Sequence, residues 1–243
     1  MRAADFYTGI VAEAYGPLRG DVVEAGPYLD LVRAEGEPAL ELGCGDVGPF
    51  LELVAAGVDV EGVDSSADMV RRCREKAAAQ GLAATVHHQR MEDLALPRRF
   101  RSVYLAGATF NLLPDDATAA AALLSITRHL VPGGAALVPL WSPPPTPAEQ
   151  IGRVREAVTE QGRQARFHVV GEEYDAAART RTTHVRYRLD GPDGVQEADR
   201  DWVMHWYTDD GFRLLAEGAG LTVERVEVPA DDERVVLLRR AAS

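Results

Sequence analysis

Short apolar runs alternate with longer amphipathic stretches over the first two thirds of the chain. One amphipathic stretch, "SADMVRRCREKAAAQG", begins at Ser66, a suitable N-cap, and stops at Gly81, which suits the position just after a helix. Because apolar runs and helical stretches alternate, the pattern predicts a parallel sheet with helices on both faces. The five runs predicted to be strands are "PALELG", "VDVEGVD", "ATVHHQ", "SVYLAG" and "AALVPLW".

The pattern changes after Trp141, where the proline-rich "SPPPTP" cannot continue a strand ladder. A helix is expected over residues 147–161. Beyond it the apolar residues recur with a period of two, and the turn "DGPDG" separates the last two runs. This spacing predicts an antiparallel meander inserted into the α/β fold. Its three strands are "RFHVVGEEY", "TRTTHVRYRL" and "ADRDWVMHWYT".

Both ends of the chain add to the central sheet or cover it. Residues 3–35 are expected to be largely helical, with breaks near Gly16 and at Gly26-Pro27. A helix from about Thr208 and two closing strands, "LTVERVEV" and "RVVLLRR", complete a Rossmann-like, mostly parallel sheet of seven strands. The predicted segments are a helical cap (1–36), a Rossmann-like core (37–141), an inserted meander (142–207) and a C-terminal completion of the core (208–243).

The composition argues against several classes of partner and site. A net charge of −12 over 243 residues repels phosphate backbones, so a nucleic-acid partner is not expected. The start of the chain lacks the apolar stretch of a secretory signal, and no apolar run approaches a membrane span, which favours a cytoplasmic protein. Cys44 and Cys73 are in no metal-binding spacing, so neither a disulfide nor a metal site is predicted.

The stretch "ELGCGDVGPF" is the main candidate for chemistry, because Gly43, Gly45 and Gly48 form G-x-G-x-x-G. Glycines after a strand let the backbone approach a ligand closely. Asp64, at the end of the next strand, suits the ribose hydroxyls of a bound adenosine. These features fit a nicotinamide dinucleotide and S-adenosylmethionine (SAM) equally well.

Glu41 favours SAM, because a carboxylate repels a pyrophosphate but attracts the ammonium and sulfonium of SAM. With its surroundings, this stretch resembles the class I SAM-dependent methyltransferases of the small-molecule type. The resemblance covers residues 38–141 most clearly and 208–240 more loosely. It is carried by the segments "LELGCG", "VEGVDSSADMV", "RMEDLALPRRF", "AGATFNLLPD" and "LVPGGAALVPL", in the order and spacing of that family.

The resemblance implies a transferase that moves a methyl group from SAM to N or O of a small metabolite, leaving S-adenosylhomocysteine. An NAD-dependent oxidoreductase is the alternative that the literal glycine pattern keeps open. A SAM-binding enzyme or partner protein that does not methylate is another. The residues that the resemblance places around the cofactor are Glu41, Gly43, Cys44, Gly45, Asp64, Ser65, Met69, Arg90, Met91, Glu92, Ala106 and Gly107.

Two positions depart from the family's pattern. Val47 stands where its third glycine usually falls, and its side chain is expected to turn inward toward the core. Arg90 stands where the family commonly has an aspartate that contacts the adenine amine, so Glu92 is the remaining candidate for that contact.

Candidates for the methyl acceptor's site are Tyr15, Phe110, Asn111 and Trp141. A hydroxyl acceptor would need a general base whereas a neutral amine would not, and His205 is the candidate base. The inserted meander is expected either to select the substrate or to form the surface of a homodimer.

Overall fold

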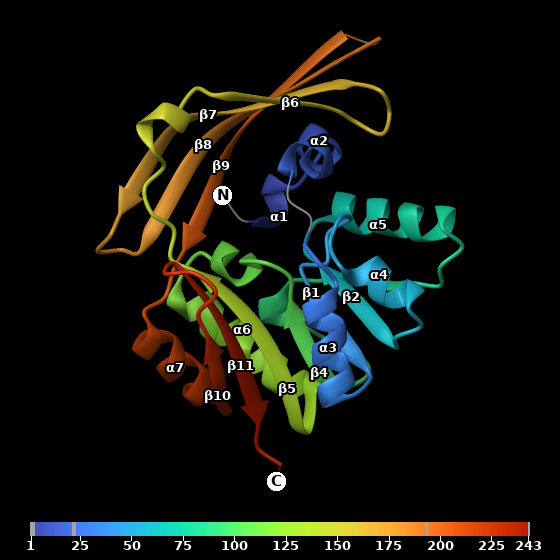
Figure 1. Cartoon of the computed structure of the whole chain (residues 1–243), viewed down its shortest axis with the longest axis vertical. Coiled ribbons are helices and arrows are strands. Elements are labelled where there is room, and N and C mark those ends of the chain that lie inside the picture. The colour runs from blue at the N-terminus through green and yellow to red at the C-terminus, as the bar shows by residue number, and fades with distance from the viewer. Residues whose placement is uncertain (1–2, 21–22, 193, 243) are drawn as a thin grey trace.

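The computed structural model describes residues 3–20, 23–192 and 194–242 (Figure 1). The helices are α1 (Ala3–Phe6), α2 (Ile10–Arg19), α3 (Gly26–Glu35), α4 (Phe50–Ala55), α5 (Ala67–Ala79), α6 (Asp116–His129) and α7 (Asp209–Gly218), with short 3₁₀ turns at Met91–Asp93, Thr109–Leu112 and Ala148–Gln150. The strands are β1 (Ala39–Leu42), β2 (Val60–Asp64), β3 (Thr85–His88), β4 (Phe100–Leu105), β5 (Leu130–Trp141), β6 (Val154–Val158), β7 (Gln164–Asp175), β8 (Thr180–Gly191), β9 (Gly194–His205), β10 (Leu221–Glu227) and β11 (Glu233–Arg240).

Seven strands form one sheet in the order β10-β11-β5-β4-β1-β2-β3. The five strands from β5 to β3 run parallel, while β11 is antiparallel to both of its neighbours. The predicted fold class is confirmed. The order of the strands also places the ends of β1 and β4 at the centre of one sheet edge, where ligands bind in folds of this kind.

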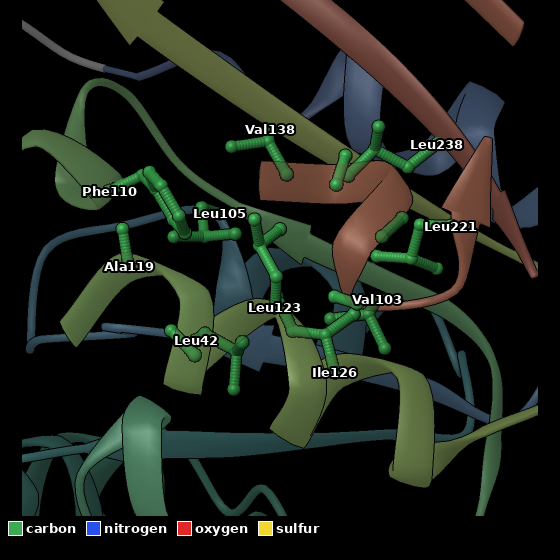
Figure 2. Packing of buried hydrophobic residues seen from close by; sticks show 14 of the residues in the cluster. Leu42, Val103, Leu105, Phe110, Ala119, Leu123, Ile126, Val138, Leu221 and Leu238 are labelled. Atoms are coloured by element: carbon green, nitrogen blue, oxygen red, sulfur yellow. The ribbon is translucent and has the colours of Figure 1, made fainter. Parts of the chain in front are cut away.

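Helices cover both faces of this sheet and bury its apolar residues. On one face, Leu123 and Ile126 of α6 pack against Leu105 and Val138 of the sheet (Figure 2). On the other face, Tyr28 of α3 and residues of α4 and α5 form a second buried cluster. Both faces of the sheet are therefore covered by helices next to the edge that carries the site.

The other four strands form a separate antiparallel sheet in the order β6-β7-β8-β9. In Figure 1 it arches over the carboxyl ends of the parallel strands, with α1 and α2 between the two sheets. Its inner face packs Val185 and Tyr187 against Phe6 and Val11 of the N-terminal helices. These contacts hold the meander and the N-terminal helices together above the site.

Capping residues begin and end α5 as expected. The Ser66 hydroxyl accepts from the Met69 amide at 3.2 Å, and Gly81 has a φ of +69° just after α5. These observations confirm the predicted limits of that helix.

The helix expected over residues 147–161 is wrong. A short 3₁₀ turn at Ala148–Gln150 is followed by strand β6, in which Ala157 pairs with Ala165 of β7. The segment is rich in helix-forming residues, but pairing along the open edge of β7 outweighs this weak local preference.

The break expected near Gly16 is also wrong, because α2 runs through Gly16 and Pro17. The chain turns instead after α2, where Gly20 caps it with a φ of +75°. Gly26-Pro27 begins α3, as a proline in the first turn permits.

Candidate functional site

A cavity of about 650 Å³ lies between the two sheets and the N-terminal helices. On one side it is bounded by the ends of β1, β2 and β4, by the turns that follow them and by residues 89–92; we call this the parallel-sheet side. On the other it is bounded by the inner faces of β7, β8 and β9, by β6, by Tyr15 of α2, by Trp141 at the end of β5 and by the start of β11; we call this the antiparallel-sheet side. All twelve residues that the sequence places around a cofactor line the cavity.

The turn after β1 is shaped by glycine. Gly43 and Gly45 have φ angles of +73° and +53°, in the left-handed region that other residues avoid. The amides of Gly43 and Cys44 both donate to the Val63 carbonyl, at 2.7 and 3.0 Å, which fixes the turn to β2. A Cβ at Gly43 would overlap Cγ2 of Thr109. The turn therefore presents bare backbone to the cavity.

Glu41 brings a buried carboxylate to the turn. The residue is fully buried, and neither carboxylate oxygen has a hydrogen-bond partner among the described residues. Burial raises the pKa of Glu41 well above its usual range, and the nearby Tyr104 hydroxyl opposes that rise. A buried acid without a partner is costly, and a bound cation would relieve that cost.

Asp64 brings a second carboxylate from the end of β2. One oxygen accepts from the Gly45 amide at 2.9 Å and the other from the Ser66 amide at 2.8 Å. Burial raises the pKa of Asp64, while these two hydrogen bonds lower it. Each oxygen keeps a lone pair for a further donor, so a pair of ribose hydroxyls fits this carboxylate.

The residues after β3 form the end of the cavity beyond Asp64. Met69 of α5 is buried and faces the cavity with Met91, giving two apolar surfaces suited to a flat base. Arg90 donates from Nε to Oε1 of Glu92 at 2.6 Å, so the arginine holds the carboxylate that could contact a base.

Val47 does not turn inward to the core as expected. It lines the cavity half-buried, and its Cγ1 lies 2.7 Å from where a Cβ on Gly16 would be. Helix α2 keeps a glycine at this position because a larger side chain would collide with Val47. The valine thus joins the glycine-rich turn to the helix above it.

The candidates for the acceptor's site divide into two pairs. Tyr15 and Trp141 line the cavity, whereas Phe110 and Asn111 are fully buried outside it. Asn111 exchanges hydrogen bonds with the main chain of Trp141, at 2.8 and 2.9 Å, and donates to the His205 carbonyl at 2.8 Å. Asn111 therefore connects the end of β5, in the seven-stranded sheet, to the end of β9, in the four-stranded sheet.

His205 is placed outside the lining of the cavity. Its Nε2 lies 2.9 Å from the carboxylate of Asp116, and its ring packs edge-on against Tyr207 with centroids 5.0 Å apart. The residue is 3% exposed. Register explains this position, because Met204 and Trp202 face the cavity and His205 therefore points to the opposite side of β9.

Several lining residues were missed by the sequence analysis. Most lie on strands of the antiparallel-sheet side, where only the register shows which residues face inward. A period-two alternation was visible in β8, but it did not reveal which face was covered. The missed residues on this side include Arg155, Phe167, Val185, Tyr187, Trp202, Met204, Glu233 and Arg234, and Thr109 was missed on the other.

Comparisons with known proteins fit this geometry. The profile of the family described as "Methyltransferase domain" matches residues 39–134. The chain is 30% identical over 229 residues to a dTDP-3-amino-3,6-dideoxy-alpha-D-glucopyranose N,N-dimethyltransferase from Streptomyces fradiae, and the match spans 90% of this chain and 86% of that relative.

The chain belongs to the SAM-dependent methyltransferases. Solved structures of similar proteins agree with this membership. Streptomyces venezuelae DesVI is 26% identical, with a TM-score of 0.71, over 99% of each chain. SAM-bound CalS10, an amino pentose methyltransferase from Micromonospora echinaspora, has the same fold, with 22% identity, a TM-score of 0.68 and coverage of 97% of this chain and 98% of that one.

The methyltransferase uses SAM, and the residues of the parallel-sheet side fit that cofactor. The Glu41 carboxyl is buried and has no hydrogen-bond partner among the described residues, so a cationic ligand would suit it. An NAD-dependent oxidoreductase finds no support, since the relatives named above are methyltransferases or share their fold. None of the helices in residues 3–20, 23–192 and 194–242 is both long and apolar enough to cross a bilayer.

Proposed function

We propose that this methyltransferase acts on the amino nitrogen of a small molecule, an amino sugar carried on a nucleotide diphosphate. The observation that carries the proposal is the likeness to the Streptomyces fradiae sugar N,N-dimethyltransferase, which extends over 90% of this chain and includes the antiparallel-sheet side. The geometry of the cavity supports both parts of the proposal, the nitrogen and the nucleotide.

The tyrosines of the cavity favour nitrogen over oxygen as the acceptor. Burial raises the pKa of the Tyr7 phenol well above its usual range and also raises the pKa of Tyr187. Both phenols therefore stay protonated near neutral pH and do not serve as strong bases. A neutral amine attacks without such a base, whereas a hydroxyl requires one.

Two arginines on the antiparallel-sheet side suit a phosphate. Arg155 lies with its guanidinium carbon 6.0 Å from the centre of the Phe167 ring, and Arg234 lies 3.4 Å from the Asp209 carboxylate. Both line the cavity of a protein whose net charge is −12. Arginines placed in this way would attract a diphosphate that the rest of the surface repels.

SAM, when bound, would supply the methyl group that is transferred from its sulfonium. The chain's own residues would bind SAM and the acceptor and align them with each other. The glycine-rich turn and Asp64 would fix one partner on the parallel-sheet side. Tyr15, Trp141 and the inner strands would fix the other on the antiparallel-sheet side. Proximity and alignment would supply most of the rate, because a direct displacement develops little new charge for the protein to stabilise.

The assigned role of Asp64 leads to one prediction. Asp64→Ala is expected to weaken SAM binding by about 1–3 kcal/mol, the cost of removing a charged hydrogen-bond partner. Calorimetric titration of SAM into both proteins measures the loss. An unchanged affinity would remove the ribose contact from the proposal.

The acceptor class is tested by turnover. The enzyme is incubated with SAM and three kinds of acceptor: dTDP-linked amino sugars, free amino sugars and peptides with a free N-terminus. S-adenosylhomocysteine should form fastest with a dTDP-linked amino sugar, and mass spectrometry should find one or two added methyl groups. The corresponding hydroxy sugar is the matched control. Turnover of that control at the same rate as the amine would contradict the assignment to nitrogen.

A further inference from the structure

A buried arginine lies behind the aromatic wall of the antiparallel-sheet side. Arg181 of β8 has a side chain that is only 7% exposed. Its guanidinium carbon lies 4.8 Å from the centre of the Trp141 ring and 5.9 Å from that of Trp202. Both indoles line the cavity, whereas Arg181 is not among the described residues that do so. The arginine therefore contacts the wall from outside.

The other contacts of Arg181 fix its position. Nη1 donates to the Pro144 carbonyl at 2.9 Å, and Nε lies 3.7 Å from the carboxylate of Glu172, whose side chain is also 7% exposed. Glu172 in turn accepts from the Thr146 amide at 2.8 Å. Arg181 is thus held against the segment that connects β5 to the antiparallel sheet.

The energetics suggest that this ion pair does more than stabilise the fold. A buried ion pair is often no more stabilising than apolar residues of the same volume, because desolvation offsets the attraction. A cation between two indoles gains more when it is desolvated, since the attraction to the rings is then unscreened. Arg181 has this arrangement, and its planar guanidinium can lie flat on a ring, which an ammonium cannot do.

Trp141 is fixed at its far edge as well. Its indole N–H donates to Asp232 at 2.7 Å, and its main chain is bonded to Asn111. With Arg181 on its face, the ring has little freedom to turn. The N–H of Trp202 has no partner among the described residues, so its ring lacks such an anchor. Trp202 packs against apolar residues of the inner face, and the Arg181 guanidinium lies beside its ring.

We propose that Arg181 is a positioning residue for the methyl acceptor. By contacting both indoles, Arg181 sets the spacing of the Trp141 and Trp202 rings. These rings would bind the flat or C–H face of the acceptor and place it beside the methyl carbon that is transferred. This inference rests on the proposed function, because it assumes that the acceptor binds on the antiparallel-sheet side. It predicts an effect on the acceptor's KM and none on the affinity for SAM.

The first test uses steady-state kinetics with the best dTDP-linked amino sugar from the turnover assay. Arg181→Met should raise the acceptor's KM about tenfold, because part of the energy of the Arg181–indole contacts no longer holds the two rings in place, and should leave the SAM dissociation constant within about twofold. Arg181→Lys keeps the charge beside Glu172 and should raise the KM less. Arg186→Met is the matched control, since Arg186 lies on the outer face of β8, where it pairs with Asp199 at 2.6 Å.

A double variant separates positioning from general stability. If Arg181 acts through the indoles, adding Arg181→Met to Trp141→Phe should raise the KM by less than it does in the wild-type background. Fully additive effects on KM would overturn the proposal. An equal loss of SAM affinity in Arg181→Met would also overturn it, because the arginine would then support the whole fold.

The second test needs no acceptor, so it still tests the positioning role of Arg181 when the proposed function is wrong. The chain has three tryptophans, and Trp206→Phe leaves Trp141 and Trp202 as the only indole fluorophores. In that background Arg181→Met should increase acrylamide quenching about twofold or more, because the rings are freed, while Arg186→Met should not. Unchanged quenching would overturn the positioning role. Absence of turnover by the wild-type enzyme would refute the proposed function alone.

Discussion

The two sides of the cavity are built in different ways. The parallel-sheet side centres on backbone and two buried carboxylates in the short stretches 41–48 and 64–69, with residues 89–92 and the turn after β4 beside them. The antiparallel-sheet side is made largely of aromatic, apolar and arginine side chains drawn from residues 141–235. The parallel-sheet side depends on a turn that few sequences can form. The antiparallel-sheet side depends on which face of each strand is turned toward the cavity. A local pattern in the sequence can therefore reveal the first side but not the second.

The largest predicted effect lies at the base of the parallel-sheet side. Asp46 is completely buried and contacts Arg72 at 2.8 Å and Lys76 at 3.1 Å. Asp46→Ala should lower the free energy of unfolding by about 3–5 kcal/mol, because it leaves two cations without their buried partner. Urea denaturation measures the difference.

Glu160, in the turn between β6 and β7, is the matched control for Asp46. It pairs with the same Lys76 at 3.1 Å but is 55% exposed. Glu160→Ala should cost at most about 1 kcal/mol. Equal losses in the two variants would mean that the two sides of the cavity depend on each other more than their construction suggests.

Glycine substitutions in the turn should have the next largest effect. Gly43→Ala is expected to weaken SAM binding by about 2 kcal/mol or more, because left-handed backbone disfavours a side chain and Thr109 must move. Gly45→Ala should cost less, since nothing lies within 4 Å of the added carbon. Calorimetric titration of SAM into both variants separates the cost of backbone strain, which they share, from the cost of overlap with Thr109, which only Gly43→Ala has.

Thr109→Ser provides a rescue for Gly43→Ala. Serine keeps the hydroxyl that donates to the Ala106 carbonyl at 2.8 Å but lacks the methyl group in the way. The double variant should recover part of the lost affinity. No recovery would show that strain in the turn, rather than the contact with Thr109, is responsible.

The ionisation of Glu41 should make the stability of the free protein depend on pH. Its pKa is raised in the folded protein, so the folded state binds the proton more tightly than the unfolded state. Without SAM, stability should therefore fall as pH rises from about 4.3 through the raised pKa. Glu41→Gln should remove this fall, making the free protein more stable than wild type at neutral pH while weakening SAM binding about tenfold. Thermal unfolding across pH, with and without SAM, measures both effects.

The smallest effect is expected at His205. Because this residue faces Asp116 outside the cavity, His205→Gln should leave turnover with an amine acceptor within about twofold of wild type. A large fall in kcat with unchanged SAM affinity would instead restore the histidine as a base.

The parts of the fold that could be predicted from sequence are those with local causes. The Ser66 cap, the alternation of strands and helices, and the glycine-rich turn depend on neighbouring residues, so their patterns are visible along the chain. The helix predicted over residues 147–161 was wrong, because pairing with β7 outweighed the local preference for a helix. Phe110 and Asn111 were placed at the correct edge of the sheet, but which side chains turn into the core depends on contacts with β5 and β9.

Local patterns along the chain were enough to predict the glycine-rich turn, the carboxylates of Glu41 and Asp64 beside it and the parallel sheet that brings them together. Which face of the antiparallel sheet covers the cavity became clear only from the packing of the folded chain. Alternation with a period of two along a strand defines two faces but does not say which of them is buried. Packing of β8 against the N-terminal helices settles that choice, and it depends on residues more than a hundred positions apart.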